Sequence, residues 1–370
     1  MRFPEFSEEW ESKRLDECVT FLDEQRKPIK STERSSESKL YPYYGASGVI
    51  DYIDDYIFDE ELILLSEDGA NILDRNYRVA FIIKGKTWVN NHAHVLKPMK
   101  NVDISYLSEY LESLKYEKYN TGSTMPKLNQ EVCRSIRVWI PQYEEQSKIG
   151  RLLSVINERI ETQKKIIEKY ESLIRGISNK LLYKFEGASV RLGDILIERS
   201  ERTKINNQHE VLSSTVKGIF SQREYFSKDI ASENNIGYKI IRLQDVVLSP
   251  QNLWMGNINY NDKFDIGIVS PSYKIFSIAD GYDKRFVAGL LKTHRALYNY
   301  MQVSEQGASI VRRNLNMEAF EQLVFKMPPL CKQQKIGNAI SVLSSRLGIA
   351  NRIKLDLELQ KDWLLREMFI

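Results

Sequence analysis

The sequence predicts an α+β protein, in which two diverged mixed α/β domains are joined by two long antiparallel coiled-coil helices in a pseudo-two-fold internal repeat. Three observations predict this fold. A segment that begins at Pro141 recurs 187 positions later, and such repeats fix the architecture before any other feature. Each copy carries apolar residues at alternating steps of four and three, the period of a coiled-coil seam. Each copy also follows a block of about 140 residues with short β-rich runs.

The repeated segment sets the division of the chain. The identical positions include Pro141 and Pro328, Gln146 and Gln333, Lys148-Ile149-Gly150 and Lys335-Ile336-Gly337, Ser154-Val155 and Ser341-Val342, and Arg159 and Arg346. We therefore expect a first domain, a central long helix, a second domain and a C-terminal long helix, at residues 1–141, 142–186, 187–328 and 329–370.

The apolar stripe of each copy predicts the seam along which the helices pack. Its members are Ile149, Leu153, Ile156, Ile160, Ile167, Ile174 and Ile177 in the first copy, and Ile336, Ile340, Leu343 and Leu347 in the second. The second copy continues through Ile353 and is less regular, because Lys354 and Lys361 lie near the stripe. Each helix is long enough to reach ~60 Å at 1.5 Å per residue. The alternative is a pair of amphipathic helices in separate bundles, and duplication of the whole segment argues against it.

The two blocks share a plan of short strands and capped helices. Runs rich in Ile, Val, Phe and Tyr predict strands at 62–66, 79–83, 87–90, 94–96, 238–242, 246–249, 267–269 and 273–278. Helices are expected near 103–116 and 283–302, with Asp103 and Asp283 as their N-caps. A short helix then follows Asn129 in one block and Asn316 in the other.

Composition limits the function classes without naming one. The net charge is only +3, and residues 1–141 carry 19 basic against 24 acidic side chains, a net of −5. This is not the footprint of a simple basic DNA-binding domain. The three cysteines are isolated, which fits a reducing compartment. No signal pattern and no long apolar run is present, so we expect a soluble cytoplasmic protein with no membrane partner.

The sequence argues against catalytic and metal sites in this chain. Gly85-Lys86-Thr87 lacks the earlier glycine of a phosphate loop and runs into a strand. His92 and His94 would lie on one strand face, but no third ligand is near in sequence. No nucleophile motif, no Asn-Pro-Pro-aromatic motif and no Gly-rich loop for a methyl donor occurs. We therefore expect a non-catalytic chain without a metal or cofactor of its own.

Polar loops recur at equivalent places in both blocks, and their residue types suit DNA contacts. Asn, Gln, Lys and Arg read base edges, while Ser and Thr hold phosphates. An ordinary turn or cap is the competing interpretation for each single residue. The candidates in the first block are Tyr43, Tyr44, Ser47, Asn71, Asn90, Asn91, His92, Ser123, Thr124 and Lys127. Those in the second block are Ser214, Thr215, Lys217, Gln251, Asn252, Ser270, Ser272, Tyr273, Ser309, Arg312 and Arg313.

At this point the whole chain resembles the specificity subunit of a type I restriction-modification enzyme. The resemblance is carried by Tyr43-Tyr44-Gly45-Ala46-Ser47-Gly48, Trp88-Val89-Asn90-Asn91-His92-Ala93-His94, Gly122-Ser123-Thr124-Met125-Pro126-Lys127-Leu128-Asn129, Pro141-Gln142-Tyr143-Glu144-Glu145-Gln146, Gly267-Ile268-Val269-Ser270-Pro271-Ser272-Tyr273 and Pro328-Pro329-Leu330. The second half departs most, since Gly307-Ala308-Ser309-Ile310-Val311-Arg312 replaces the GSTMPKL form.

The resemblance implies a division of labour. Residues 1–141 and 187–328 would be target-recognition domains, each reading half of an asymmetric, bipartite double-stranded DNA site. Two modification subunits would methylate adenine N6 with S-adenosylmethionine, and two restriction subunits would use ATP and Mg to cleave DNA, in the cytoplasm of a bacterium or archaeon. The charged helix faces would dock the modification subunits, as at Glu158, Glu161, Lys164, Lys165, Glu168 and Glu171.

Two other functions remain open on the sequence. In a type IIB-like system, methylation and cleavage would share one other polypeptide, and nothing in this chain separates that case from a type I system. A coiled-coil scaffold that binds proteins through its two blocks is the second alternative, mildly favoured by the weak overall charge, since phosphate contacts usually come from Lys and Arg.

Overall fold

The computed structural model describes residues 2–34, 40–181, 187–225, 234–306 and 313–369. The chain divides into two compact units, residues 1–164 with 352–370, and residues 165–351. Two long helices, α5 (Tyr143–Leu181) and α11 (Leu330–Met368), each contribute a segment to both units. The sequence predicts these two helices at residues 142–186 and 329–370. Among the residues described, no helix combines the length and the apolar character that crossing a membrane needs.

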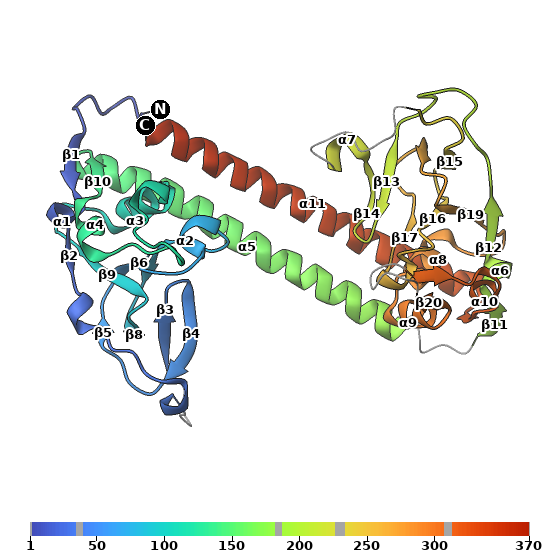
Figure 1. The fold of residues 1–370 in the computed structure, drawn as a ribbon, viewed down its shortest axis with the longest axis horizontal. Coiled ribbons are helices and arrows are strands. Elements are labelled where there is room, and N and C mark those ends of the chain that lie inside the picture. Colours follow the sequence, from blue (N-terminus) through green and yellow to red (C-terminus); the bar gives the residue numbers. More distant parts are fainter. Residues whose placement is uncertain (1, 35–39, 182–186, 226–233, 307–312, 370) are drawn as a thin grey trace. The chain divides into compact units, whose positions relative to one another are not determined.

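The strands of the first unit, coloured blue to green in Figure 1, form two four-stranded sheets and one further pair. One has the order β2-β9-β6-β7, the other β4-β3-β8-β5, and a β1-β10 pair closes the domain. Its strands are β1 (Glu11–Arg14), β2 (Val19–Phe21), β3 (Tyr41–Gly45), β4 (Gly48–Ile53), β5 (Phe58–Asp59), β6 (Leu62–Ser66), β7 (Ala80–Ile83), β8 (Lys86–Val89), β9 (Ala93–Pro98) and β10 (Arg137–Ile140). Its short helices are α1 (Leu15–Cys18), α2 (Asn71–Asp74), α3 (Ile104–Ser113) and α4 (Gln130–Ser135).

The second unit repeats this plan. Its strands are β11 (Ala188–Arg191), β12 (Leu196–Arg199), β13 (Leu212–Thr215), β14 (Gly218–Ser221), β15 (Lys239–Arg242), β16 (Val246–Leu248), β17 (Ile258–Tyr260), β18 (Ile266–Val269), β19 (Lys274–Ile278), β20 (Ser304–Gln306), β21 (Arg313–Leu315) and β22 (Val324–Met327). Its short helices are α6 (Leu192–Ile195), α7 (Gln222–Tyr225), α8 (Lys284–Leu291), α9 (His294–Gln302) and α10 (Met317–Glu321). The order β12-β19-β16-β17 matches β2-β9-β6-β7 strand for strand, and β11-β22 matches β1-β10. The expected duplication is confirmed.

In the first unit the two long helices run antiparallel. Asn157 of α5 and Lys361 of α11 both contact Glu109. Phe369, just past the end of α11, packs against Tyr106, whose backbone lies beside Gly150 of α5. Position 150 is thus level with 369, and position 157 with 361, so the chain directions are opposite. The predicted antiparallel packing is confirmed.

The predicted seam residues face inward along both helices. Ile149, Leu153, Ile156 and Ile160 are buried in the first unit's core together with Leu357, Leu364 and Met368 of α11. In the second unit Ile336 and Ile340 are buried, and Ile177 packs against the same core. The remaining predicted members are half-buried, namely Ile167, Ile174, Leu343 and Leu347.

The register of α11 differs from the expectation after position 350. Ile353 is 41% exposed, while Lys354 is half-buried, and Lys361 has only 15% of its side chain exposed. Steps of four and three from Ala350 lead to Lys354, Leu357, Lys361 and Leu364. Placing Ile353 in the seam was therefore wrong, because the heptad period continues without a break and carries two lysines into the seam.

The repeated Pro, Gln and Gly residues form the same junction in each unit. The Gln146 side-chain amide donates to Pro141 O at 2.8 Å and its carbonyl accepts from the Asp103 amide at 2.9 Å. Gln333 makes the matching bonds to Pro328 O at 2.8 Å and from the Asp283 amide at 3.0 Å. This junction fixes each sheet domain on its own segment of long helix.

The predicted caps are confirmed, while one predicted helix is two. Asp103 and Asp283 accept the amides of Tyr106 and Phe286 at 2.9 and 2.8 Å. The expected helix over 283–302 is interrupted between α8 and α9, where the Thr293 hydroxyl accepts the Ala296 amide and starts a new helix.

Candidate nucleic-acid interface

Four loops of the first unit meet on one surface, here named loop cluster 1, which consists of residues 45–48, 67–71, 90–92 and 121–127. The turn between β3 and β4 is held by the Ser66 hydroxyl, which donates to Ala46 O at 2.6 Å. The Asn90 amide donates to Tyr44 O at 3.0 Å and ties the loop after β8 to the same hairpin. Chain segments about 45 residues apart are thereby brought together.

The other two loops join the surface through backbone hydrogen bonds. The Glu67 amide donates to His92 O at 2.9 Å, and the Gly69 amide donates to Pro126 O at 3.0 Å. The Leu128 amide completes the connection by donating to Glu67 O at 2.7 Å. The loop at 67–71 is consequently the centre of the cluster, with the loops at 90–92 and 121–127 on either side of it.

The loop at 121–127 has a defined shape because Asn120 holds it. The Asn120 side-chain carbonyl accepts the amides of Gly122 and Lys127 at 3.0 and 2.9 Å. A side chain at Gly122 would place its Cβ 1.8 Å from Met125 O, so only glycine fits there. Ser123, Thr124 and Met125 are exposed at the tip of this loop. The sequence predicts no role for Asn120, since an isolated Asn two residues before Gly122 is typical of an ordinary turn.

Buried charges support the centre of loop cluster 1 from below. The His94 ring faces Asp23 Oδ2 at 2.6 Å through Nδ1 and Leu128 O at 2.8 Å through Nε2, so both nitrogens donate. Burial alone would lower the pKa of His94, but the hydrogen bond that His94 donates to Asp23 and the charge of that carboxylate raise the pKa to about 10. The pKa of Asp23 lies below its usual value, since His94 and Arg26 outweigh the effect of burial.

Arg26 links this buried pair to the surface. Its guanidinium donates to Glu67 at 2.6 Å and to Ala93 O at 2.8 Å, and Lys127 lies 3.5 Å from the same Glu67 carboxylate. His94 therefore holds the loops in place and has no free nitrogen for a metal, which argues against a metal site at His92 and His94. Among the residues described, no group of three His, Cys, Asp or Glu side chains is arranged to hold a metal ion.

Most of the predicted contact residues of the first unit lie exposed on loop cluster 1. They are Ser47, Asn91, His92, Ser123, Thr124 and Lys127. The His92 ring is oriented by Asp68, whose two carboxylate oxygens are each 2.9 Å from Nδ1. These side chains give the surface hydroxyl, amide and cationic groups within one continuous set of loops.

The other predicted residues of the first unit have structural roles. Tyr43 is only 2% exposed and packs against Ile53 and Trp88, so the prediction that it contacts DNA is wrong. Asn90 is 4% exposed, and its side chain accepts the His92 amide, which shapes the loop from inside. Tyr44 is half-buried. Asn71 uses both amide atoms on the backbone of Tyr77, at 3.0 and 2.7 Å. Short polar side chains at turns commonly bond their own backbone in this way.

The second unit has a corresponding surface, here named loop cluster 2, which consists of residues 213–218, 251–256, 270–273 and Arg313. A buried amide network fixes its hairpin. The Asn259 side chain donates to Ser214 Oγ at 2.7 Å and to Thr215 O at 2.8 Å. The Asn257 side chain donates to Ser214 O at 3.0 Å, and the Tyr273 hydroxyl donates to the same carbonyl at 2.9 Å. The turn at 215–218 is thereby locked to two other strands.

Lys292 and Arg313 attach the remaining loop of the cluster. The Lys292 ammonium donates to Gly256 O at 2.9 Å and to Val216 O at 3.5 Å, so it joins two loops. The residue as a whole is exposed, yet burial of its ammonium between these two loops lowers the pKa of Lys292 to about 8. The Arg313 guanidinium lies 4.7 Å from the centre of the Trp254 ring, and its amide donates to Gln251 O at 3.2 Å.

The predicted residues of the second unit divide in the same manner. Lys217, Gln251 and Ser272 are exposed, while Thr215, Asn252, Ser270, Tyr273 and Arg313 are half-buried. Ser214 is only 2% exposed, and its role is in the amide network, so the prediction that it contacts DNA is wrong. Ser309 and Arg312 lie outside the described residues. Asn257 and Asn259 were missed, although their spacing of two on a strand would have placed both side chains on one face.

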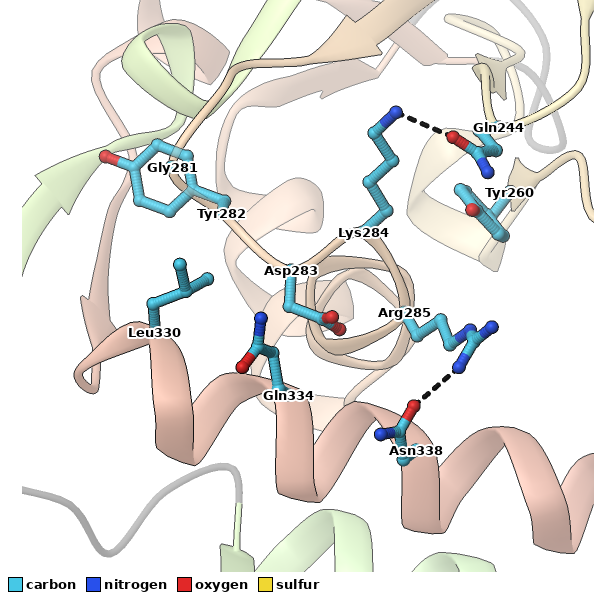
Figure 2. Close-up of a pocket in the computed structure, with 10 residues that line it drawn as sticks. All are labelled: Gln244, Tyr260, Gly281, Tyr282, Asp283, Lys284, Arg285, Leu330, Gln334 and Asn338. Atoms are coloured by element: carbon cyan, nitrogen blue, oxygen red, sulfur yellow. Dashed lines mark hydrogen bonds between the residues drawn. The ribbon is translucent and has the colours of Figure 1, made fainter.

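A polar pocket in the second unit lies away from these loops. It has a volume of about 580 Å³ and lies where the start of α8 meets α11. Figure 2 shows Lys284 bonded to Gln244 and Arg285 bonded to Asn338 at its walls. None of the residues predicted to contact DNA lines it, so the candidate interface is the loop clusters and not the cavity.

Comparison with known proteins gives three agreeing results. The model of the type I restriction modification DNA specificity domain matches residues 7–172. A putative type I restriction enzyme specificity subunit of Haemophilus influenzae is 33% identical over 148 residues, 40% of this chain and 37% of that protein. A type I restriction enzyme specificity subunit of Methanocaldococcus jannaschii is 26% identical over 254 residues, 65% of this chain and 56% of that protein. The aligned parts thus span less than two thirds of either relative.

A solved structure shares the fold over the full length. The crystal structure of the type I restriction-modification S subunit of M. genitalium aligns with a TM-score of 0.71 at 14% identity, covering 100% of this chain and 99% of that one. The match at this identity concerns the fold. The resemblance drawn from the sequence is confirmed over residues 7–172, which match the model of the type I restriction modification DNA specificity domain.

Proposed function

We propose that this chain is the DNA-recognition subunit of a type I restriction-modification complex, with loop cluster 1 and loop cluster 2 each reading one part of a bipartite, asymmetric site. One observation carries the proposal: in each unit, loops distant in sequence converge on one surface rich in hydroxyl, amide and cationic side chains. Such groups hydrogen-bond base edges and phosphates. Because the two clusters differ in their residues, the two half-sites would differ in sequence.

The chemistry would belong to partner subunits in the cytoplasm. Modification subunits would methylate adenine N6 with S-adenosylmethionine, and restriction subunits would cleave DNA with ATP and Mg. In this proposal the chain is non-catalytic and holds no cofactor of its own, consistent with the lack of a nucleophile or methyl-donor motif in its sequence. The small net charge of +3 fits a subunit whose partners contribute much of the phosphate contact.

Exposed apolar side chains on the long helices support docking of a partner on each unit. The first unit exposes Val155, Leu355, Leu359 and Trp363 by 46, 51, 58 and 51%. The second exposes Ile166, Leu173, Val342 and Ile349 by 37, 42, 55 and 58%. Apolar residues rimmed by charge are typical of protein interaction sites. Exposed apolar side chains on the long-helix segments of both units fit two copies of the modification subunit, one docked on each unit.

Mapping of N6-methyladenine across the genome tests the proposal. In a strain that expresses the modification subunit, the gene should produce methylation in a two-part, non-palindromic motif with an unspecified gap, and deletion should abolish it. The triple variant S47A/T124A/K127A should weaken or alter one half of the motif and leave the other intact. Lys84→Ala, an exposed lysine paired with Glu61 outside both clusters, serves as the control. A methylome unchanged by deletion would refute the proposal.

A further inference from the structure

A buried carboxylate of the first unit is bound by three other elements. Glu109 lies on α3 and is 5% exposed. Its Oε1 accepts from Arg78 at 2.5 Å and from the Asn157 side chain of α5 at 2.9 Å. Its Oε2 forms an ion pair with the Lys361 ammonium of α11 at 2.9 Å. One carboxylate therefore contacts the sheet domain, the central helix and the C-terminal helix of the same unit.

Lys361 is the counter-charge that only α11 supplies. The Lys361 side chain is 15% exposed and Arg78 is 34% exposed, so the lysine is the more deeply placed cation. Burial would raise the pKa of Glu109, but Arg78 and Lys361 outweigh it and keep that pKa below its ordinary value. The group is thus charged and enclosed. Removing one partner of such a buried pair is far more costly than replacing both by apolar groups.

The other half of the repeat has no equivalent of this triad. The shift of 187 positions places Ile174 of α5 where Lys361 stands, and Ser344 where Asn157 stands. The matching N-caps, Asp103 and Asp283, place Gly289 at the position of Glu109. The charge is therefore unique to the pairing of the first unit with the C-terminal part of α11.

We propose that Glu109 selects the C-terminal segment of α11 as the helix that completes the first unit, and rejects the equivalent segment of α5 from a second copy of the chain. Both helices carry the same heptad seam, so apolar packing alone discriminates poorly between them. With α5 of another copy in place, Ile174 would face Glu109 Oε2 and leave it without the ammonium. A single polar residue at a seam is known to fix partner and register in this way.

The first test is hydrogen exchange of residues 352–368 in the full-length chain. Lys361→Ile copies the residue found at the equivalent place in α5. It should speed exchange of this segment about 10- to 100-fold, because the buried carboxylate loses its counter-charge. Lys354→Ile is the matched control: it makes the same change one heptad earlier, where the lysine pairs with Glu358 of its own helix. Equal exchange in the two variants would overturn the proposal.

The second test separates partner selection from simple stabilisation. The apolar double variant E109L/K361I should regain the protection of residues 352–368, since both charges are gone. It should also lose discrimination, and after refolding at one protein concentration its dimer fraction should rise well above that of the wild type by light scattering. A recovered segment with an unchanged dimer fraction would show that Glu109 stabilises the unit without selecting its partner.

A third variant keeps Glu109 in place and is informative if the double variant fails to fold. I174K/K361I moves the lysine from α11 to α5, so that α5 of a second copy becomes the matched partner for Glu109. Its dimer fraction should exceed those of Lys361→Ile and the wild type. A monomer that matches the wild type would contradict the selection of α11 by Glu109.

Discussion

Gly150 allows α5 to approach the start of α3, and replacing it should loosen the first unit. An alanine Cβ at this position would lie 2.7 Å from the Tyr106 amide nitrogen, 2.8 Å from Asp103 Oδ1 and 3.0 Å from Ser105 Cβ. Two of the three atoms form the hydrogen bond that caps α3. They would have to withdraw by about 0.6 Å to reach an ordinary contact of about 3.4 Å, so the substitution would force the helices apart or break the cap.

The expected loss follows from three contributions. Overpacking costs about 1–3 kcal/mol, and loss of the cap costs about 1 kcal/mol. Alanine is preferred over glycine within a helix by about 1 kcal/mol. The net destabilisation of Gly150→Ala should therefore be about 1–3 kcal/mol. An alanine Cβ at Gly176 of the same helix would have no neighbour within 4 Å, so Gly176→Ala should gain about 0.5–1 kcal/mol.

Hydrogen exchange of α3 measures this effect locally, which is preferable to a global melt because the chain has two units. Amides of 104–113 should exchange faster in Gly150→Ala and at the wild-type rate in Gly176→Ala. Gly337→Ala should have the same effect on α8, since its Cβ would lie 2.3 Å from Asp283 Oδ1 and 2.7 Å from the Phe286 amide. Slower or equal exchange of α3 in Gly150→Ala would refute the close-approach argument.

Three further predictions concern the loop clusters. The contribution of His94 to the free energy of unfolding of the first unit should be complete below its ordinary pKa of about 6.5 and should be lost as the pH rises toward about 10. Denaturation at several pH values should show this decline in stability, and His94→Gln should flatten it. Asn120→Ala should free the loop at 121–127 and impair methylation at one half-site, and it should lower the free energy of unfolding by about 1 kcal/mol at most. Asn259→Ala removes the 2.7 and 2.8 Å hydrogen bonds to the β13–β14 hairpin and should lower the free energy of unfolding by about 1–3 kcal/mol. It should impair methylation only at the other half-site. Impairment of both half-sites by either variant would contradict the proposal that each loop cluster reads one half-site.

The regular parts of the fold could be predicted because they follow from short-range rules. The heptad stripe identified the inward faces of both helices, and Asp103 and Asp283 capped helices where their side chains suggested. The same reasoning failed at Ile353, where an apolar residue was preferred over Lys354 although the period required the lysine. A long aliphatic stem lets lysine occupy a half-buried seam position, so residue type is a weaker guide there than spacing.

The candidate site could be predicted only in part, because loop geometry depends on contacts between distant segments. The sequence identified loops that the structure brings together in each unit, but not which side chain in each loop faces outward. Tyr43 and Ser214 were expected at the surface and are buried, since the strand alternation around each turn points them into the core. Asn120 and Asn259 look like ordinary polar residues. Asn120 binds amides of its own loop, whereas the role of Asn259 emerges only when the fold brings the β13–β14 hairpin beside it.

The contrast between the junctions and the loop clusters explains why one part of the repeat is recognisable and the other is not. Gln146 and Gln333 make matching bonds in the two units, and Gly150 and Gly337 occupy matching close approaches. Any substitution there would shift a whole sheet domain on its helix segment. The hairpin turns, by contrast, are held by a serine–carbonyl bond in one unit and by an asparagine network in the other. A loop can thus be rebuilt with different partners while the junction beneath it keeps the same geometry. Two loop clusters with different residues are therefore compatible with one repeated junction between sheet domain and long helix.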